Sequence, residues 1–256
     1  MEIKVLDIIN YIKSWANEDY QEDWDNTGEQ ILFSNEITNS VVIGMDVSDN
    51  LIDLAIKNNS KLIITHHPFF FQRIKNIKDS DYKGSIIIKS IKNNISIYSS
   101  HTSLDITKGG VNHTLAKVLE IDYLDDFVKT DKGLNLGLIC KNSKYKDIFE
   151  IKKFFNNKGI ENIKIYGKKP KSLKKIALLG GAGAEYMKEA LKKEVDLFIT
   201  SDVKYHDGQW AYENNICVMD IGHFGSEKFI IEEISNRLKQ NFNIEVHEYS
   251  KNIFEI

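Results

Sequence analysis

The chain has few cysteines and prolines and no long apolar run. Of its 256 residues, two are cysteine and two are proline. Two cysteines build neither a disulfide framework nor a thiolate metal site, so Cys140 and Cys217, each in an apolar strand-like run, are expected to be buried free thiols in a reducing cytoplasm. No run approaches the roughly 20 apolar residues of a membrane span. The first 20 residues interleave acids and lysines as in an amphipathic helix, unlike a signal peptide.

Neither sign of charge dominates the chain. The 34 lysines and arginines nearly balance 37 acids, for a net charge of -3. This balance gives no global field that would attract nucleic acid or an acidic membrane. The basic stretch 168–175 lacks interleaved aromatic residues, and we interpret it as a solvated loop. With 42% hydrophobic residues, the composition is typical of a globular protein of one large or two modest domains.

Short β-branched runs alternate with helical patterns, the order typical of α/β proteins with largely parallel strands. In the first half the predicted strands are 40–46, 61–65 and 95–100, and the predicted helices are 48–59, 84–94 and 109–120. The second half repeats this order, with strands at 175–179, 196–200 and 216–220 and helices at 184–194, 206–215 and 227–240. We predict two similar α/β halves, 1–128 and 129–256, with mixed, largely parallel sheets.

Polar residues follow equivalent strands in the two halves. Strand 61–65 leads to His66 and His67, and strand 196–200 leads to Ser201 and Asp202. The next strands lead to His101 and His223, each followed four residues later by a carboxylate, Asp105 and Glu227 respectively. We interpret this as an internal duplication, with a chance match of short segments as the alternative. Open α/β sheets bind their ligands at the carboxyl ends of strands.

Histidines at these strand ends predict a metal site. A lone histidine is usually a surface or a satisfied core residue, but five lie at or just beyond predicted strand ends: His66, His67, His101, His206 and His223. Adjacent histidines in an extended chain point to opposite sides, so His66 and His67 suit two metal ions better than one. We expect Glu227 to bridge the ions, Asp105 to complete one coordination shell, and the metal site to lie between the halves.

The remaining polar candidates are assigned by chemistry. His101 and His206 suit proton transfer, and Asp202 suits a supporting or substrate-binding role. Nitrogen and oxygen ligands without sulfur favour two divalent ions drawn from Zn, Fe, Mn, Co or Ni.

Two glycine-containing segments have open interpretations. Gly181 and Gly183 match the first two glycines of a dinucleotide fingerprint, but Tyr186 stands where the third should be, so the segment is either a phosphate site or a structural turn. Trp24 and Asn26 precede Gly28 in a loop that forms either a packed turn or a wall of the site.

Seven motifs in this order resemble the GTP cyclohydrolase I type 2 homolog family, also called the NIF-three-like family. They are WDNTG (24–28), THHPFF (65–70), SSHTSLD (99–105), GGVNHTLA (109–116), GGAGAEY (180–186), TSDVKYHD (200–207) and DIGHFGSE (220–227). The resemblance implies a dinuclear metal centre on His66, His67, Asp105, His223 and Glu227, and a toroidal homohexamer whose sites face an internal cavity. Glu29, Ser201-Asp202 and His113 depart from the family pattern, which affects expected substrate contacts more than metal binding.

Three functions follow from this set of residues. The first is a metal-dependent hydrolase, which the resemblance directs toward GTP or another nucleotide or phosphoester. The second is a non-enzymatic metal-handling or protein-interaction ring, which predicts reversible metal exchange without turnover. In the third, the ions only join the two halves, and chelation unfolds the chain.

Overall fold

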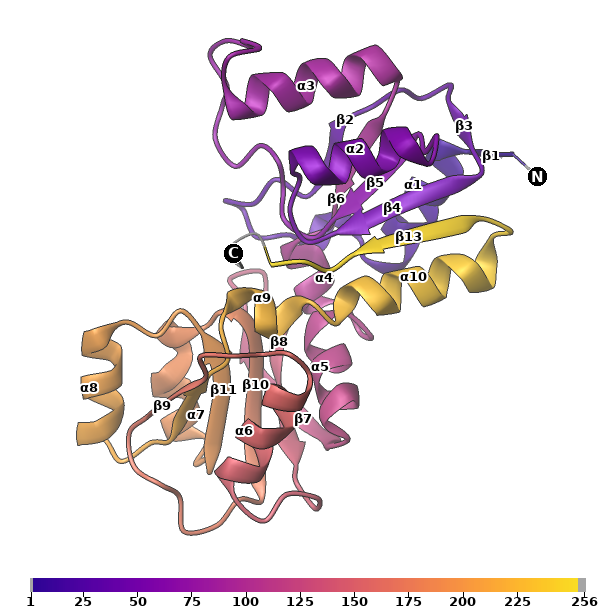
Figure 1. The fold of residues 1–256 in the computed structure, drawn as a ribbon. Helices are drawn as coiled ribbons and strands as arrows, with labels where there is room; N and C mark the ends of the chain where they lie inside the picture. Colours follow the sequence, from indigo (N-terminus) through magenta and orange to yellow (C-terminus); the bar gives the residue numbers. More distant parts are fainter. Residues whose placement is uncertain (1, 253–256) are drawn as a thin grey trace. The chain divides into compact units, whose positions relative to one another are not determined.

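The computed structural model describes residues 2–252. These residues form two compact units, shown in Figure 1. Unit 1 comprises residues 2–107 with 230–252, and unit 2 comprises Lys108–Phe229. We predicted a division after residue 128. The boundaries differ because residues 122–129 pair with a strand of unit 2, while residues 245–249 return to pair with a strand of unit 1.

Unit 1 is built on a five-stranded sheet of order β13-β4-β5-β6-β2. β13, β4, β5 and β6 run parallel to their neighbours, and β2 runs antiparallel to β6. The bounds of these strands are β2 Gly28–Ile31, β4 Ser40–Gly44, β5 Leu62–Thr65, β6 Ser96–Ser99 and β13 Glu245–Tyr249. A separate antiparallel pair joins β1 (Ile3–Lys4) to β3 (Ile37–Thr38).

The helices of unit 1 cover this sheet. They are α1 Val5–Trp15, η1 Glu18–Tyr20, α2 Asp49–Lys57, α3 Tyr82–Asn93, α4 Thr102–Ile106 and α10 Ile230–Asn241. The hydroxyl of Ser48 accepts a hydrogen bond from the Leu51 N–H and caps α2.

Both faces of the unit 1 sheet are buried. Val42, Ile63 and Ile97 are cross-strand neighbours on one face and pack with the apolar sides of α2 and α3, which Figure 1 shows together. The alternate strand residues Ile43 and Ile64 are also fully buried. Largely parallel sheets require this double cover, because their strands are apolar on both sides. The arrangement leaves the strand ends as the place for polar side chains.

Unit 2 contains a six-stranded sheet of order β7-β8-β10-β11-β12-β9. β10, β11 and β12 are parallel, whereas β7, β8 and β9 join antiparallel, so antiparallel neighbours outnumber parallel ones in this unit, contrary to our expectation. The bounds are β7 Asp122–Lys129, β8 Asn135–Lys141, β9 Lys164–Tyr166, β10 Lys175–Ala182, β11 Leu197–Ser201 and β12 Val218–Asp220.

Helices pack on both faces of this second sheet. Apolar residues of α5 and α6 pack on one face with Cys140 and Cys217, and residues of α7 and α8 pack on the other. The bounds are α5 Val111–Leu119, α6 Ile148–Asn157, η2 Ala184–Tyr186, α7 Met187–Lys192, α8 Tyr205–Glu213 and α9 His223–Glu227. The basic stretch 168–175 lies between β9 and β10. The cysteines are buried and free, as predicted.

The two units share one topology. Strands β4-β5-β6-β2 of unit 1 correspond in order and direction to β10-β11-β12-β9 of unit 2. In each unit a five-residue helix, α4 or α9, follows the third parallel strand. The prediction of a mixed α/β protein with two similar halves is therefore confirmed.

One predicted helix is divided. The expected helix 227–240 begins at Ile230, and Glu227 instead ends the separate short helix α9. This division keeps Glu227 on the same helix as His223. Within residues 2–252, the structure contains no helix long and apolar enough to cross a membrane.

Candidate metal centre

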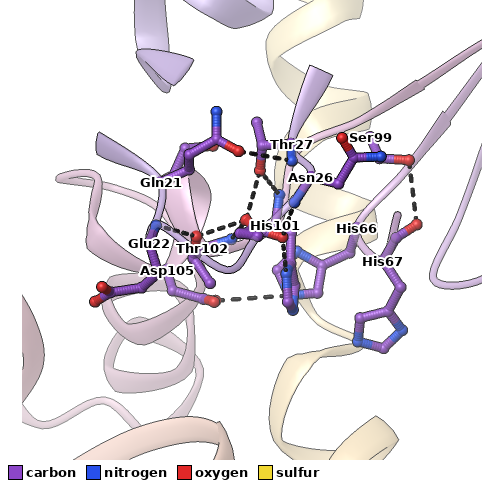
Figure 2. Close-up of polar contacts among 12 residues, drawn as sticks. Gln21, Glu22, Asn26, Thr27, His66, His67, Ser99, His101, Thr102 and Asp105 are labelled. Atoms are coloured by element: carbon purple, nitrogen blue, oxygen red, sulfur yellow. Dashed lines mark hydrogen bonds and ion pairs between the residues drawn. The ribbon is translucent and has the colours of Figure 1, made fainter. Parts of the chain in front are cut away.

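Three imidazoles gather where β5 and β6 end in unit 1. His66 and His67 follow β5, and His101 follows β6. Their ring centroids are separated by 5.0 Å (His66 to His67), 5.2 Å (His66 to His101) and 5.6 Å (His67 to His101). One ring nitrogen from each lies within 4.8 Å of the others, close enough to hold a metal ion. Figure 2 shows these rings with Asp105 beside them, and we call the four residues the N-terminal cluster.

Each imidazole of this cluster is oriented through its Nδ1 atom. The Nδ1 atoms of His66, His67 and His101 lie 2.9 Å from the Ser100 carbonyl oxygen, 2.8 Å from Asp46 Oδ1 and 2.7 Å from Asp25 Oδ1, respectively. A carbonyl or carboxylate oxygen only accepts, so each Nδ1 carries the proton and donates. In the neutral ring the lone pair is then on Nε2. This is how metal-binding histidines are held by their outer partners.

Asp105 faces the first of these rings. It lies on α4, and its Oδ1 atom is 3.6 Å from His66 Nε2. Two ligands of one tetrahedral ion, each about 2.1 Å from it, lie about 3.4 Å apart. The pair therefore has the separation expected of two ligands of the same ion. His66 is fully buried and Asp105 nearly so, which favours a site shielded from bulk water.

In unit 2, α9 presents a second pair of ligand types, which we call the C-terminal pair. His223 Nδ1 lies 2.6 Å from Asp202 Oδ2, and His223 Nε2 lies 3.3 Å from Glu227 Oε2. The outer carboxylate again fixes the tautomer, and the inner one lies at ligand-to-ligand separation. Glu227 is 2% exposed. Burying an ionised carboxylate is costly unless cations or donors compensate it, so this residue favours a cation.

A glycine makes room for the Glu227 carboxylate. Gly181 has a φ of +72°, and a Cβ atom there would collide with Glu227 Oε1. Its N–H donates to the Ser226 hydroxyl at 2.8 Å, and its carbonyl accepts from Ser201 at 2.6 Å. The preceding N–H, of Gly180, donates to Asn112. These N–H groups are already used, so the geometry favours the structural interpretation of the glycine segment over a phosphate cradle.

The other predicted residues have different surroundings. Trp24 is 64% exposed and lies edge-on to His101, and the Asn26 side-chain amide donates to the Phe70 carbonyl, so their loop borders the N-terminal cluster. His206 is exposed on α8, with its Nδ1 atom 3.4 Å from Gln209, and belongs to none of the ligand groups found among the described residues. A Cβ atom on Gly183 would collide with Thr200 and Leu179.

Sequence reasoning missed Asp25 and Asp46. Asp46 lies two residues beyond β4, at the same sheet edge as His67, and that position was the available signal. Asp25 lies within WDNTG and has a fully buried side chain. Burial opposes ionisation of Asp25, but the hydrogen bond and charge of His101, with the Thr102 hydroxyl, hold its pKa well below the ordinary value. Asp25 therefore supports the His101 imidazole as an anion, and Asp46 accepts from His67 Nδ1 at 2.8 Å.

Several known proteins are similar to this chain in sequence and in fold. A GTP cyclohydrolase 1 type 2 homolog of Clostridium acetobutylicum is 32% identical, with 93% of this chain and 91% of that protein covered. A GTP cyclohydrolase 1 type 2 of Helicobacter pylori is 31% identical, with 94% of each covered. The structure of reduced HcgD from Methanocaldococcus jannaschii has a TM-score of 0.84 at 25% identity, covering 97% of this chain and 98% of that one.

The family comparison agrees with the motifs found in the sequence. The model of the Duf34/NIF3 (NGG1p interacting factor 3) family matches residues 3–253, nearly the whole chain. This chain therefore belongs to the Duf34/NIF3 family.

Proposed function

We propose that this protein binds two divalent metal ions and uses them to hydrolyse a nucleotide or phosphoester. The proposed ligands are His66, His67, Asp105, His223 and Glu227. The observation that carries the proposal is the shared orientation of the histidines. Each Nδ1 donates to a fixed oxygen, while Nε2 of His66 and of His223 faces a carboxylate at 3.6 Å and 3.3 Å.

The donor set limits the choice of ions. Imidazole nitrogens and carboxylate oxygens without thiolate suit Zn, Fe, Mn, Co or Ni. Divalent ions coordinate and polarise the oxygens of an anionic substrate, which supports a nucleotide or phosphoester. Because the Helicobacter pylori relative is a GTP cyclohydrolase 1 type 2, GTP is the first substrate to test.

Hydrolysis needs an activated water, a polarised electrophile and a proton carrier. Bound divalent ions supply the first two. We assign the third to His101, because Asp25 holds its Nδ1 at 2.7 Å and so orients Nε2 to exchange a proton. His206 is a second candidate for proton transfer, and Asn26 and Asp202 remain candidates for substrate contact.

Replacing Glu227 by Gln tests this function. The substitution keeps the shape of the side chain but removes its charge, so we expect a lower metal content and loss of turnover, with the fold intact. Glu232→Gln, an exposed change on α10, is the matched control. Full activity of Glu227→Gln would refute the assignment. If metal-loaded native protein turned over none of a panel of nucleotides and phosphoesters, the non-enzymatic metal-handling function would replace the hydrolase.

We further propose a cytoplasmic homohexamer, following the family resemblance. The two buried free thiols support a reducing compartment. Light scattering during gel filtration should give the mass of six chains of 29.5 kDa. A monomer or dimer at micromolar concentration would exclude the hexamer without affecting the metal ligands.

A further inference from the structure

Two aromatic rings flank His101 and leave much of their surface exposed. Trp24 lies edge-on to the imidazole, with centroids 5.8 Å apart and planes at 75°. Phe71 lies edge-on to the same imidazole, at 5.4 Å and 89°. Trp24 is 64% exposed and Phe71 is 49% exposed. Large ring faces in water beside a polar cluster gain free energy when a planar ligand covers them.

Hydrogen bonds fix the loops that carry these rings. The Asn26 amide donates to the Phe70 carbonyl at 2.8 Å, and the Phe70 N–H donates to Gln30 Oε1 at 3.0 Å. Asp25, next to Trp24, accepts from Thr102 at 2.6 Å as well as from His101. Figure 2 shows Asn26, Thr102 and His101 in this network. These hydrogen bonds fix the residues adjacent to both rings. A ligand would therefore bind without the free-energy cost of ordering these loops.

A basic, exposed segment follows the second ring. Residues 71–82 are all exposed and include Arg73, Lys75 and Lys78, followed by Asp79 and Asp81. Arginine is rare in this chain: Arg73 and Arg237 are the two among 34 basic residues. Arg237 uses its planar group, lying 4.0 Å over the Trp15 ring while its Nε donates to Glu233. The guanidinium fork also binds phosphate through two parallel hydrogen bonds, which lysine cannot do.

We propose that Trp24 and Phe71 grip the planar base of a nucleotide and that Arg73, two residues beyond Phe71, binds its phosphate. The inference rests on the proposed function, because it assigns the substrate of the same site. It adds two separate binding roles. The aromatic pair selects substrates that carry a base, and the basic segment selects those that carry a phosphate. A base-free sugar phosphate should then bind weakly.

Equilibrium binding to full-length, manganese-loaded protein tests this assignment. The probes are GTP, GMP, guanosine and ribose 5-phosphate, measured by calorimetry and by tryptophan fluorescence. Trp24→Ala and Phe71→Ala should each weaken GMP and guanosine binding about 5- to 100-fold, the range of base stacking on an aromatic ring. Ribose 5-phosphate binding and manganese stoichiometry should stay unchanged. Trp24→Phe should retain most of the affinity, and Phe149→Ala, a half-exposed ring on α6, is the matched control.

Substitution of Arg73 should affect the opposite set of probes. Arg73→Ala and Arg73→Lys should each weaken GMP and ribose 5-phosphate binding about tenfold while sparing guanosine. The proposal is overturned if the native protein binds neither GTP nor GMP, binds ribose 5-phosphate as tightly as GMP, or keeps native GMP affinity in both aromatic variants. Binding with these signatures but without turnover would defeat the hydrolase proposal and leave the aromatic pair standing. Turnover at the native rate by both aromatic variants would defeat the aromatic pair and leave the hydrolase proposal standing.

Discussion

At the scale of single residues, carboxylates behind the histidines organise the candidate metal centre. Asp25, Asp46 and Asp202 each accept a hydrogen bond from the Nδ1 of one imidazole, at 2.6 to 2.8 Å. Such outer partners set the tautomer, the ring orientation and the basicity of a metal-binding histidine. They should therefore influence metal affinity without touching the metal.

Replacing Asp46 by Asn tests this influence on His67. The amide is a weaker acceptor than the carboxylate and can turn its NH2 group toward Nδ1, which would favour the wrong tautomer. We expect metal affinity to fall about 10- to 100-fold with little change in folding stability. Competition with a chelating dye measures the affinity. Asp53→Asn, an exposed carboxylate paired with Lys89, is the control, and equal affinities in the two variants would contradict the prediction.

Replacing Gly181 by Ala should displace the Glu227 carboxylate. The new methyl group meets the Glu227 carboxylate, and the backbone is left-handed at φ +72°. Gly133→Ala separates the two effects, because its φ is +74° but nothing lies within 4 Å of the added carbon. Both variants should lose about 1 to 2 kcal/mol from the backbone. Only Gly181→Ala should also lose metal affinity, and a native affinity in that variant would argue against Glu227 as a ligand.

The two thiols should be unreactive in the folded protein. Burial raises the pKa of Cys140 to about 12, with a contribution from Asp122, and raises that of Cys217 to about 11. At pH 8 both groups therefore remain protonated, and the thiolate is the reactive form. An aromatic disulfide reagent should label neither cysteine in native buffer and both in guanidinium. Rapid labelling of the native protein would show that the core of unit 2 that contains both thiols opens easily.

At the scale of elements, the C-terminal strand β13 completes the sheet of unit 1. It runs parallel to β4, with Val246 opposite Val41 and Tyr249 opposite Gly44. The helix before it, α10, contributes buried apolar residues such as Ile234 and Leu238. Segments more than 100 residues apart in sequence thus form one unit, which makes unit 1 dependent on the end of the chain.

A chain that ends at Asn243 should destabilise unit 1 selectively. Removing β13 takes away one of the two parallel neighbours of β4 and exposes backbone groups and apolar side chains, at a cost on the order of a few kcal/mol. Hydrogen exchange should show lower protection of β4 and α10 and unchanged protection of β10 and β11. A control chain ending at Asn252 keeps every described element. Uniform loss of protection would mean that the two units unfold as one.

At the scale of the whole molecule, two units with separate apolar cores make the fold independent of bound metal. Unit 1 is built around the α2 and α3 side chains, and unit 2 has a core on each face of its sheet. Neither core needs an ion to close it, unlike the core of a small zinc domain.

Removal of the metal ions by a chelator should therefore abolish the proposed activity without unfolding the protein. We expect the far-ultraviolet circular dichroism to be unchanged in EDTA and the melting temperature to rise when manganese is added. At a free ion concentration one hundred times the Kd, each site should contribute about 2.7 kcal/mol. Scanning calorimetry with and without EDTA checks this. Loss of secondary structure in EDTA would instead assign the ions a structural role.

The sequence alone determined the fold class, the duplication and the ligand types, because the period of apolar residues and the polar residues at strand ends are local signals. The tertiary structure decided what depends on distant pairing. Asp25 and Asp46 accept hydrogen bonds from histidines 76 and 21 residues away. Gly181 leaves room for the Glu227 carboxylate, which lies far along the chain. The return of β13 to unit 1 likewise follows from sheet register, which periodicity does not encode. Local pattern selects the element and its face, whereas only packing selects the neighbour.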